Sequence, residues 1–122
     1  MLLNYVALEN NNQKEQELVS KAKQGDREAL SQLVSIYSRR IYHFGLKLTG
    51  NEQDAEDILQ DTFLTMLKKI NQFQGRSSFY TWLYRIAINI GLRKIQSKKM
   101  NYQLDSINDP DIEKIHSEHI YK

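Results

Sequence analysis

Apolar side chains recur every three or four residues along three long stretches of this chain, and a glycine precedes each stretch. This spacing places the apolar side chains on one face of an α-helix, so each stretch predicts an amphipathic helix. The clearest stripe lies within residues 27–48: Leu30, Leu33, Val34, Tyr37, Ile41, Phe44 and Leu48. Helices that are apolar on one face must bury it against one another. The sequence therefore predicts an all-α fold, a compact bundle of three long helices plus a short N-terminal helix.

Turn and capping signals give approximate bounds for these helices. We expect the short N-terminal helix over about residues 15–24, where Gly25 suits the position after its end and Asp26 can cap the next helix. The long helices are expected over about 27–48, 52–70 and 77–96, the last capped by Ser77 or Ser78. The predicted inner faces of the last two are Ala55, Ile58, Leu59, Thr62, Phe63, Met66, Leu67 and Ile70, and Phe79, Trp82, Leu83, Ile86, Ala87 and Ile90.

Outside the bundle, the pattern is weaker. Residues 1–13 lack apolar periodicity and are expected to be a flexible leader, so the helical domain covers 14–99. Residues 100–122 are expected to be a linker, with a turn at Asp109-Pro110.

Composition and motifs argue against an enzyme. The chain has no cysteine, so neither a disulfide nor a thiolate metal site is possible. His116 and His119 share a helical spacing but have no third ligand nearby, and no nucleophile or phosphate-binding motif is present. We therefore expect no catalytic site, no metal and no cofactor. The sequence also lacks a signal peptide and a membrane-spanning apolar run, so we expect a cytoplasmic protein without membrane insertion.

Charges of opposite sign are separated along the chain. Residues 51–61 contain acids and no base, whereas residues 76–100 contain bases and no acid. The net charge of +2 hides this separation. Separate acidic and basic surfaces can bind two partners of opposite charge, although both can also be solvated helix faces.

Aromatic residues are concentrated where the basic stretch begins. Five of the twelve aromatic side chains fall within residues 73–84, close to Arg76 and Arg85. Aromatic rings beside arginines suit single-stranded nucleic acid, because unstacked bases stack on the rings and phosphates contact the cations. The alternative is that Phe79 and Trp82 belong to the core, which leaves Tyr80 and other polar-tipped side chains for the surface.

Three segments stand out in sequence: residues 18–29 with KQGD at 23–26, DAEDILQDTF at 54–63 and FQGRSSFYTWLYRIAIN at 73–89. In this order and spacing they resemble the region 2 domain of bacterial sigma factors of the extracytoplasmic-function type. DAEDILQDTF at 54–63 is similar to their region 2.2, and FQGRSSFYTWLYRIAIN at 73–89 to their regions 2.3 and 2.4. Residues 18–29, with KQGD at 23–26, resemble the opening of that domain. The likeness covers about residues 17–95.

The resemblance implies a role for each charged segment. The third helix would dock on the clamp helices of the β′ subunit of core RNA polymerase, through Asp54, Asp57, Gln60, Asp61 and Leu64. The loop and the fourth helix would capture a flipped base of the single-stranded non-template −10 element. Its DNA-binding residues would be Phe73, Gln74, Gly75, Arg76, Ser77, Phe79, Tyr80, Arg85, Asn89, Arg93 and Lys94. The acidic and the aromatic-basic surfaces are thus expected to be opposed, on adjacent helices.

As a whole, the resemblance predicts a non-enzymatic sigma factor domain that recognises and melts the promoter −10 element, with an anti-sigma factor as a further partner. Two alternatives remain: an interaction module that occupies the polymerase or an anti-sigma factor without melting DNA, and an ordinary duplex-binding protein. The sequence departs from the family in two ways. It includes no C-terminal −35-reading domain (region 4), toward which residues 100–122 would lead. Gly91 also stands where alanine is common. It would either allow close approach of a backbone or a DNA strand, or be sequence drift without a structural role.

Overall fold

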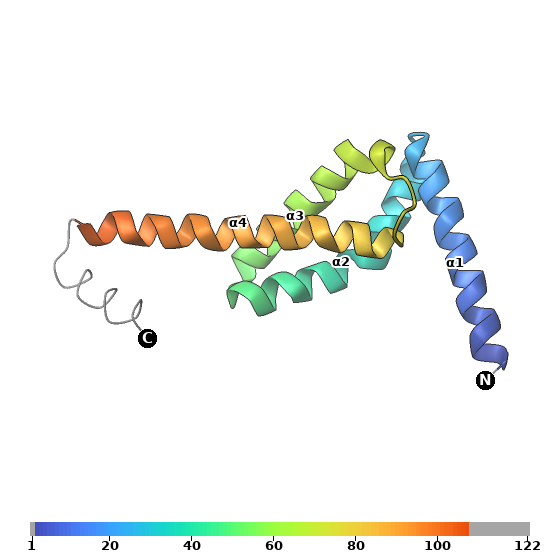
Figure 1. The fold of residues 1–122 in the computed structure, drawn as a ribbon, viewed down its shortest axis with the longest axis horizontal. Coiled ribbons are helices and arrows are strands. Elements are labelled where there is room, and N and C mark those ends of the chain that lie inside the picture. The colour runs from blue at the N-terminus through green and yellow to red at the C-terminus, as the bar shows by residue number, and fades with distance from the viewer. Residues whose placement is uncertain (1, 108–122) are drawn as a thin grey trace.

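The structure, a computed structural model, describes the backbone of residues 2–107 and the side chains of residues 13–101. It contains four α-helices in this range: α1 (Leu2–Lys23), α2 (Arg27–Thr49), α3 (Glu52–Lys69) and α4 (Phe79–Ile107). A short 3-10 helix, η1 (Ile70–Gln72), follows α3 directly. Figure 1 shows that these helices form the whole of the described fold, which confirms the all-α prediction.

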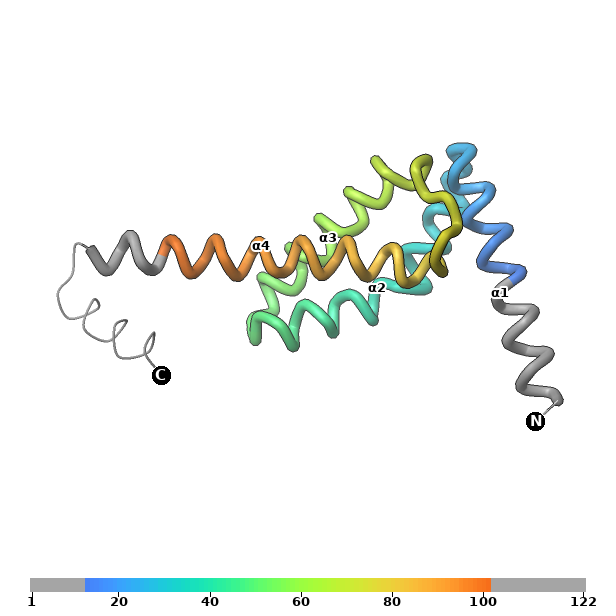
Figure 2. Tube along the Cα trace, viewed as in Figure 1, coloured from blue at the N-terminus to red at the C-terminus, as the bar shows by residue number. Residues whose placement is uncertain are grey.

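Helices α2, α3 and α4 form the body of the bundle, and α1 lies across one end of it (Figure 1). The most extensive packing is between α2 and α3, followed by α3 against α4 and α1 against α2. Helix α4 continues well past the ends of α2 and α3. The connection between η1 and α4 passes close to α1, so residues distant in sequence meet at this end (Figure 2).

The helix boundaries follow from the predicted caps. Gly25 has a φ of 90°, and the Asp26 carboxylate accepts hydrogen bonds from the backbone N–H of Glu28 (2.9 Å) and Ala29 (3.2 Å). The Ser78 hydroxyl accepts one from the backbone N–H of Thr81 (3.1 Å). Each cap supplies an acceptor to a donor that has no partner within its own helix.

The core consists of the predicted inner faces, with few exceptions. Its largest completely buried side chains come from all three long helices: Leu33, Ile41, Ile58, Met66, Leu83 and Thr62. The Thr62 hydroxyl is satisfied by donating to the backbone carbonyl of Ile58 at 2.6 Å. Leu67 was wrongly predicted to face inward. It is exposed, because each residue of an α-helix turns by about 100° and this step moves Leu67 away from the face that buries Met66.

Two helices are longer than predicted. Helix α1 begins at Leu2 and not near residue 15, and α4 ends at Ile107 and not near residue 96. Neither extension contains a glycine or proline, so the backbone can stay helical without an apolar stripe. The proposed division into leader, domain and linker stays a prediction. Asp109-Pro110 and both C-terminal histidines lie outside the described residues.

The space beside Gly91 is filled by the Leu48 side chain of α2, so neither another backbone nor DNA can approach it there. A Cβ at this position would lie 2.5 Å from Cδ2 of Leu48, on α2. At Gly45 the obstacle is backbone, which cannot move aside as a side chain can. A Cβ there would lie 3.1 Å from the Cα of Ala55. The small residues 45 and 55 therefore allow α2 and α3 to approach closely.

Candidate functional sites

The loop of residues 73–78 is held by a cluster of aromatic rings. Phe73 packs edge-on against Phe79, with ring centroids 5.7 Å apart, and both rings contact Trp82 at 5.3 and 5.6 Å. Phe73 is 8% exposed and Phe79 is 3% exposed. Both belong to the hydrophobic core, as the alternative interpretation of Phe79 expected. Both rings pack under the loop with little exposed surface, so a base cannot stack fully on either of them.

A hollow of about 620 Å³ opens between this loop and α1, and we call it the loop hollow. Four predicted DNA-binding residues other than Phe73 line it: Gln74, Gly75, Ser77 and Phe79. Gly75, with a φ of 72°, gives the loop a backbone turn that other residues rarely adopt. The volume falls within the range of small-molecule pockets, about 300–1,000 Å³.

Helix α1 forms the other wall of the loop hollow. The residues that it contributes lie on one helical face: Glu15, Gln16, Val19, Ser20 and Lys23. The Lys23 ammonium donates a hydrogen bond to the backbone carbonyl of Phe73 (2.7 Å), which ties the loop to the end of α1. The sequence analysis missed this wall, because no local pattern shows that residue 23 meets residue 73.

A polar contact deeper in the fold orients Glu15. The Tyr37 hydroxyl donates a short hydrogen bond to Oε1 of Glu15. Burial, and then this hydrogen bond, raise the pKa of Tyr37 above its ordinary value of 10.0. The hydroxyl therefore stays protonated and remains a donor at neutral pH.

Tyr80 lies at the surface between α2 and α4. Its ring stacks on that of Tyr37, with centroids 5.3 Å apart and an interplanar angle of 28°. The Arg40 guanidinium lies 5.2 Å from the Tyr80 ring centroid, a cation–π contact. Tyr80 is thus half-buried and already partnered, with Arg40 as a neighbour that the sequence analysis did not identify.

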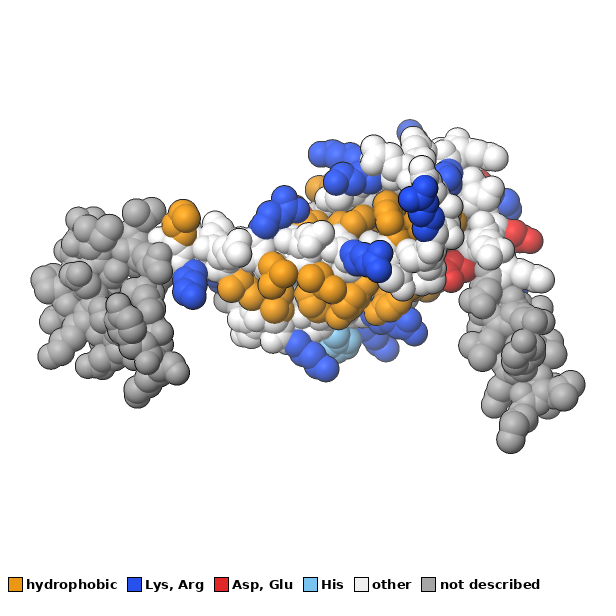
Figure 3. All heavy atoms as spheres, viewed as in Figure 1, with side chains coloured by type: hydrophobic (Ala, Val, Ile, Leu, Met, Phe, Trp, Pro, Cys, Tyr) orange, Lys and Arg blue, Asp and Glu red, His pale blue; other side chains and the backbone are white. Residues whose placement is uncertain are grey.

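The remaining predicted DNA-binding residues are spread along the molecule. Arg76 is exposed on the loop, and Arg85, Asn89 and Arg93 are exposed along α4. Figure 3 shows a face on which basic side chains surround an apolar band, while acidic side chains appear only toward α1. Asn89 does not line the loop hollow, because it lies ten residues along α4 from Phe79, about 15 Å of helical rise.

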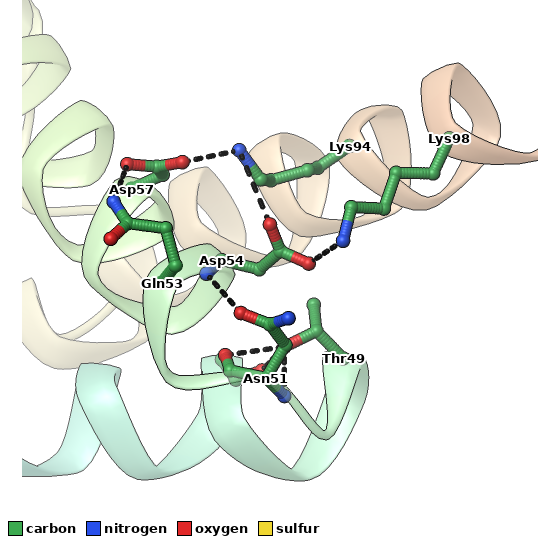
Figure 4. Close-up of polar contacts among 8 residues, drawn as sticks. Thr49, Asn51, Gln53, Asp54, Asp57, Lys94 and Lys98 are labelled. Carbon is green, nitrogen blue, oxygen red and sulfur yellow. Dashed lines mark hydrogen bonds and ion pairs between the residues drawn. The ribbon is translucent and has the colours of Figure 1, made fainter. Parts of the chain in front are cut away.

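Two of the predicted polymerase-docking acids, Asp54 and Asp57, form ion pairs with lysines farther along α4 (Figure 4). Lys94 lies 2.8 Å from Oδ2 of Asp57 and 3.9 Å from Oδ1 of Asp54, and Lys98 pairs with the other oxygen of Asp54. Asp54 is buried beneath these lysines. Its backbone N–H donates to the Asn51 side chain, which caps α3 (3.1 Å).

The pair of Asp57 and Lys94 shifts both of its partners toward their charged forms. The hydrogen bond from Lys94 lowers the pKa of Asp57 below its ordinary 3.8, and the same bond raises the pKa of Lys94 above its ordinary 10.5. Of the predicted docking residues, Asp54 is buried, whereas Asp61 and Gln60 are exposed on α3.

Arg93 and Lys94 lie beside the predicted docking residues of α3 and not beside the loop of residues 73–78. Together with Asp61 and Leu64 they line a second hollow, the α3–α4 hollow, of about 460 Å³. Leu64 is 54% exposed beside it. The expectation of two opposed surfaces is wrong at this point: the basic end of α4 neutralises part of the acidic surface, because the crossing of α3 and α4 places their charges side by side.

Comparison with known protein families matches residues 33–100 to Sigma-70 region 2. The chain belongs to this family. The match covers more than half of the chain, including α3, the loop and α4 through Met100. The family consists of transcription initiation factors that are not enzymes, which confirms that expectation.

Named relatives support the extracytoplasmic-function type. This Sigma-70 region 2 chain is 39% identical over 88 residues to the ECF RNA polymerase sigma factor SigW of Bacillus subtilis, a match that covers 72% of the chain and 47% of SigW. It is 30% identical over 110 residues to the RNA polymerase sigma-H factor of Pseudomonas aeruginosa, covering 90% of the chain and 57% of that factor. The chain thus spans about half the length of these curated relatives.

The fold is also similar to a solved structure. An engineered region 2 of sigmaE, in complex with GTAAAA, matches with a TM-score of 0.66 and 26% identity, over 71% of this chain and 90% of that one. Within residues 2–107, no helix has the length and apolarity that a membrane crossing needs.

Proposed function

We propose that this chain is the part of a sigma factor that docks on the β′ subunit of core RNA polymerase through α3 and recognises and melts the promoter −10 element beside the loop 73–78. It would act in the cytoplasm. The observation that carries the DNA-binding part is the loop hollow, an open hollow of about 620 Å³ that offers space for a base beside an exposed arginine, Arg76. The related sigmaE domain in complex with GTAAAA supports the same class of ligand.

Capture would act by selective stabilisation of the open strand. Unpairing a base costs a few kcal/mol, and contacts to a captured base return about 1–3 kcal/mol when it stacks on an aromatic side chain. Phe73 and Phe79 are almost completely buried, so the polar lining of the loop hollow must contribute through hydrogen bonds. Arg76 and Arg85 would contact phosphates, which positions the strand without reading it.

A binding comparison tests this proposal. We expect the chain to bind a single-stranded oligonucleotide containing GTAAAA more tightly than the same sequence in duplex form, measured by fluorescence anisotropy. Arg76→Ala should weaken single-strand binding, and Lys47→Ala, which removes an exposed charge far from the loop on α2, should have a smaller effect. A preference for the duplex would support an ordinary duplex-binding protein and overturn the proposal.

Docking on polymerase is tested separately. Asp61 and Leu64 are the exposed members of the predicted docking set that line the α3–α4 hollow. We expect Asp61→Ala and Leu64→Ala each to weaken binding to core RNA polymerase by roughly fivefold or more. Glu56→Ala, also exposed on α3 but outside the predicted set, is the matched control. Equal binding by all three variants would contradict docking through this surface.

One observation favours the alternative of an interaction module. Leu64 and Leu67 are both exposed on α3, an apolar surface that suits a protein partner such as polymerase or an anti-sigma factor. A chain that loses polymerase binding in Asp61→Ala, yet shows no preference for single-stranded DNA, would be such a module.

A further inference from the structure

We propose that α1 forms the second wall of the base-capture pocket, and that Glu15 selects a captured base that carries an exocyclic amine. This inference rests on the proposed function and extends it to a helix that the matched region, residues 33–100, does not include. It concerns which base is read, whereas the proposed function concerns whether a base is captured.

The first argument is geometric. Glu15, Val19 and Lys23 are spaced by four residues, so they lie along one face of α1, and all three line the loop hollow. Two independent contacts hold this face in place. Lys23 donates to the Phe73 carbonyl at the loop, and Tyr37 donates to Glu15 from α2.

The second argument concerns the chemistry of Glu15. An ionised carboxylate only accepts hydrogen bonds, and it has more acceptor positions than the Tyr37 hydroxyl uses. A second donor can therefore bind the same group from the loop hollow. Adenine, cytosine and guanine each carry an exocyclic amine that can donate, and pairing of a carboxylate with the cytosine amine is a known mode of base recognition.

Thymine is the base that Glu15 disfavours. It has no exocyclic amine, and its one ring N–H lies between two carbonyl oxygens that repel a carboxylate. Among the other polar side chains on the hollow, the amides of Gln16 and Gln74 and the hydroxyls of the lining serines can donate or accept and so discriminate less between bases. Lys23 only donates, and it is bound to the Phe73 carbonyl. Of the lining residues that the structure describes, Glu15 is the one whose side chain only accepts hydrogen bonds.

The test begins by finding the captured position. Each base of single-stranded GTAAAA is replaced in turn by an abasic residue, and binding to the full chain is measured by fluorescence anisotropy. One position should cost more affinity than the others. If no position stands out, base capture fails and the proposed function fails with it. A captured thymine would overturn the inference about Glu15 alone.

At the captured position, the exocyclic amine is then removed without other change, by using purine for adenine or hypoxanthine for guanine. We expect the wild-type chain to lose roughly tenfold in affinity, the size of one hydrogen bond to a charged group. Glu15→Ala should bind both oligonucleotides equally, and Glu15→Gln should keep part of the difference through its amide oxygen. The same tenfold loss in Glu15→Ala would show that another group reads the amine, and would overturn the inference.

Two further variants control for the fold. Glu17→Ala removes an exposed acid from the same helix, outside the loop hollow, and should keep the full tenfold difference. Tyr37→Phe keeps the buried ring and the Glu15 carboxylate but removes the orienting donor, and it should reduce the difference to about threefold. If circular dichroism shows that Glu15→Ala does not fold, Tyr37→Phe tests the inference in its place. An unchanged difference in Tyr37→Phe would contradict the orienting role.

Discussion

The two ends of the bundle are held together by different forces. At the loop end, Phe73, Phe79 and Trp82 fill the space under the loop, and one lysine–carbonyl hydrogen bond closes it. At the α3–α4 crossing, Asp54 and Asp57 are bound to Lys94 and Lys98. Buried rings stabilise by excluding water and respond little to salt, whereas partly exposed ion pairs are screened. The loop end should therefore be rigid, and the ion-paired end adjustable.

The sharpest test of this contrast removes a ring from the loop end. Phe79→Ala should destabilise the fold by about 3–5 kcal/mol, because it leaves a cavity among the rings of Phe73, Trp82 and Tyr37. Urea unfolding followed by circular dichroism measures this loss. Leu92→Ala, at an exposed apolar position of α4, should stay within about 0.5 kcal/mol of wild type. A loss below about 1 kcal/mol in Phe79→Ala would refute the buried cluster.

The corresponding change at the other end should cost less. Asp54→Ala removes the shared partner of Lys94 and Lys98. We expect a loss of about 1–2 kcal/mol, because the Lys98 ammonium can be hydrated and Lys94 keeps its pair with Asp57. The difference from wild type should shrink in about 1 M salt, in contrast to that of Phe79→Ala. Urea midpoints of Asp54→Ala and Phe79→Ala at low and high salt measure this. Equal salt responses of these two variants would contradict the proposed difference between the two ends of the bundle.

Loss of the loop tether should have a smaller effect. Lys23→Ala removes the hydrogen bond to the Phe73 carbonyl and should cost about 1 kcal/mol or less. The local effect should be larger than the global one: amide hydrogen exchange in residues 73–78 should accelerate, while exchange in α3 stays unchanged. Lys21→Ala, exposed on the same helix, serves as the control. Unaltered loop exchange would show that the aromatic cluster alone holds the loop.

The smallest expected effect is a dependence on acid pH at the ion-paired end. The hydrogen bond from Lys94 lowers the pKa of Asp57 in the folded state, so the unfolded chain binds the proton more readily. The stabilisation is complete above the ordinary pKa of 3.8 and is lost as the pH falls through the lower folded value. Urea midpoints between about pH 5 and pH 2 should therefore fall less steeply in Lys94→Gln than in wild type. Parallel curves would argue against the pair in solution.

Helices and caps were predictable from the sequence because both are local. The stripe through Leu33, Tyr37 and Ile41 and the cap at Asp26 need only neighbours within a few turns. The end of α4 was not predictable from the stripe, since Lys-rich sequence without glycine or proline stays helical after its apolar face has ended.

The candidate sites were predicted less completely, because they depend on contacts between distant segments. Phe79 has the same local sequence signature whether its ring is buried or exposed, and only the packing against Phe73 and Tyr37 decides. Lys94 looked like a phosphate contact in a basic run, but the crossing of α3 and α4 places it on Asp57. No local pattern around Glu15 predicted its contact with Tyr37, since an acid in a polar helix is usually solvated.

Helix α4 runs without a break from Phe79, beneath the loop, to Lys98, at the ion pairs. At 1.5 Å per residue, these positions are about 29 Å apart along one rod. Under the proposed function, the length of this helix would set how far the opened DNA strand lies from the polymerase contact. Inserting one residue between them would turn the two ends by about 100° relative to each other, so both sites could not engage their partners at once. If the chain docks and captures DNA as proposed, the length of this helix would determine where on the enzyme the strands can separate.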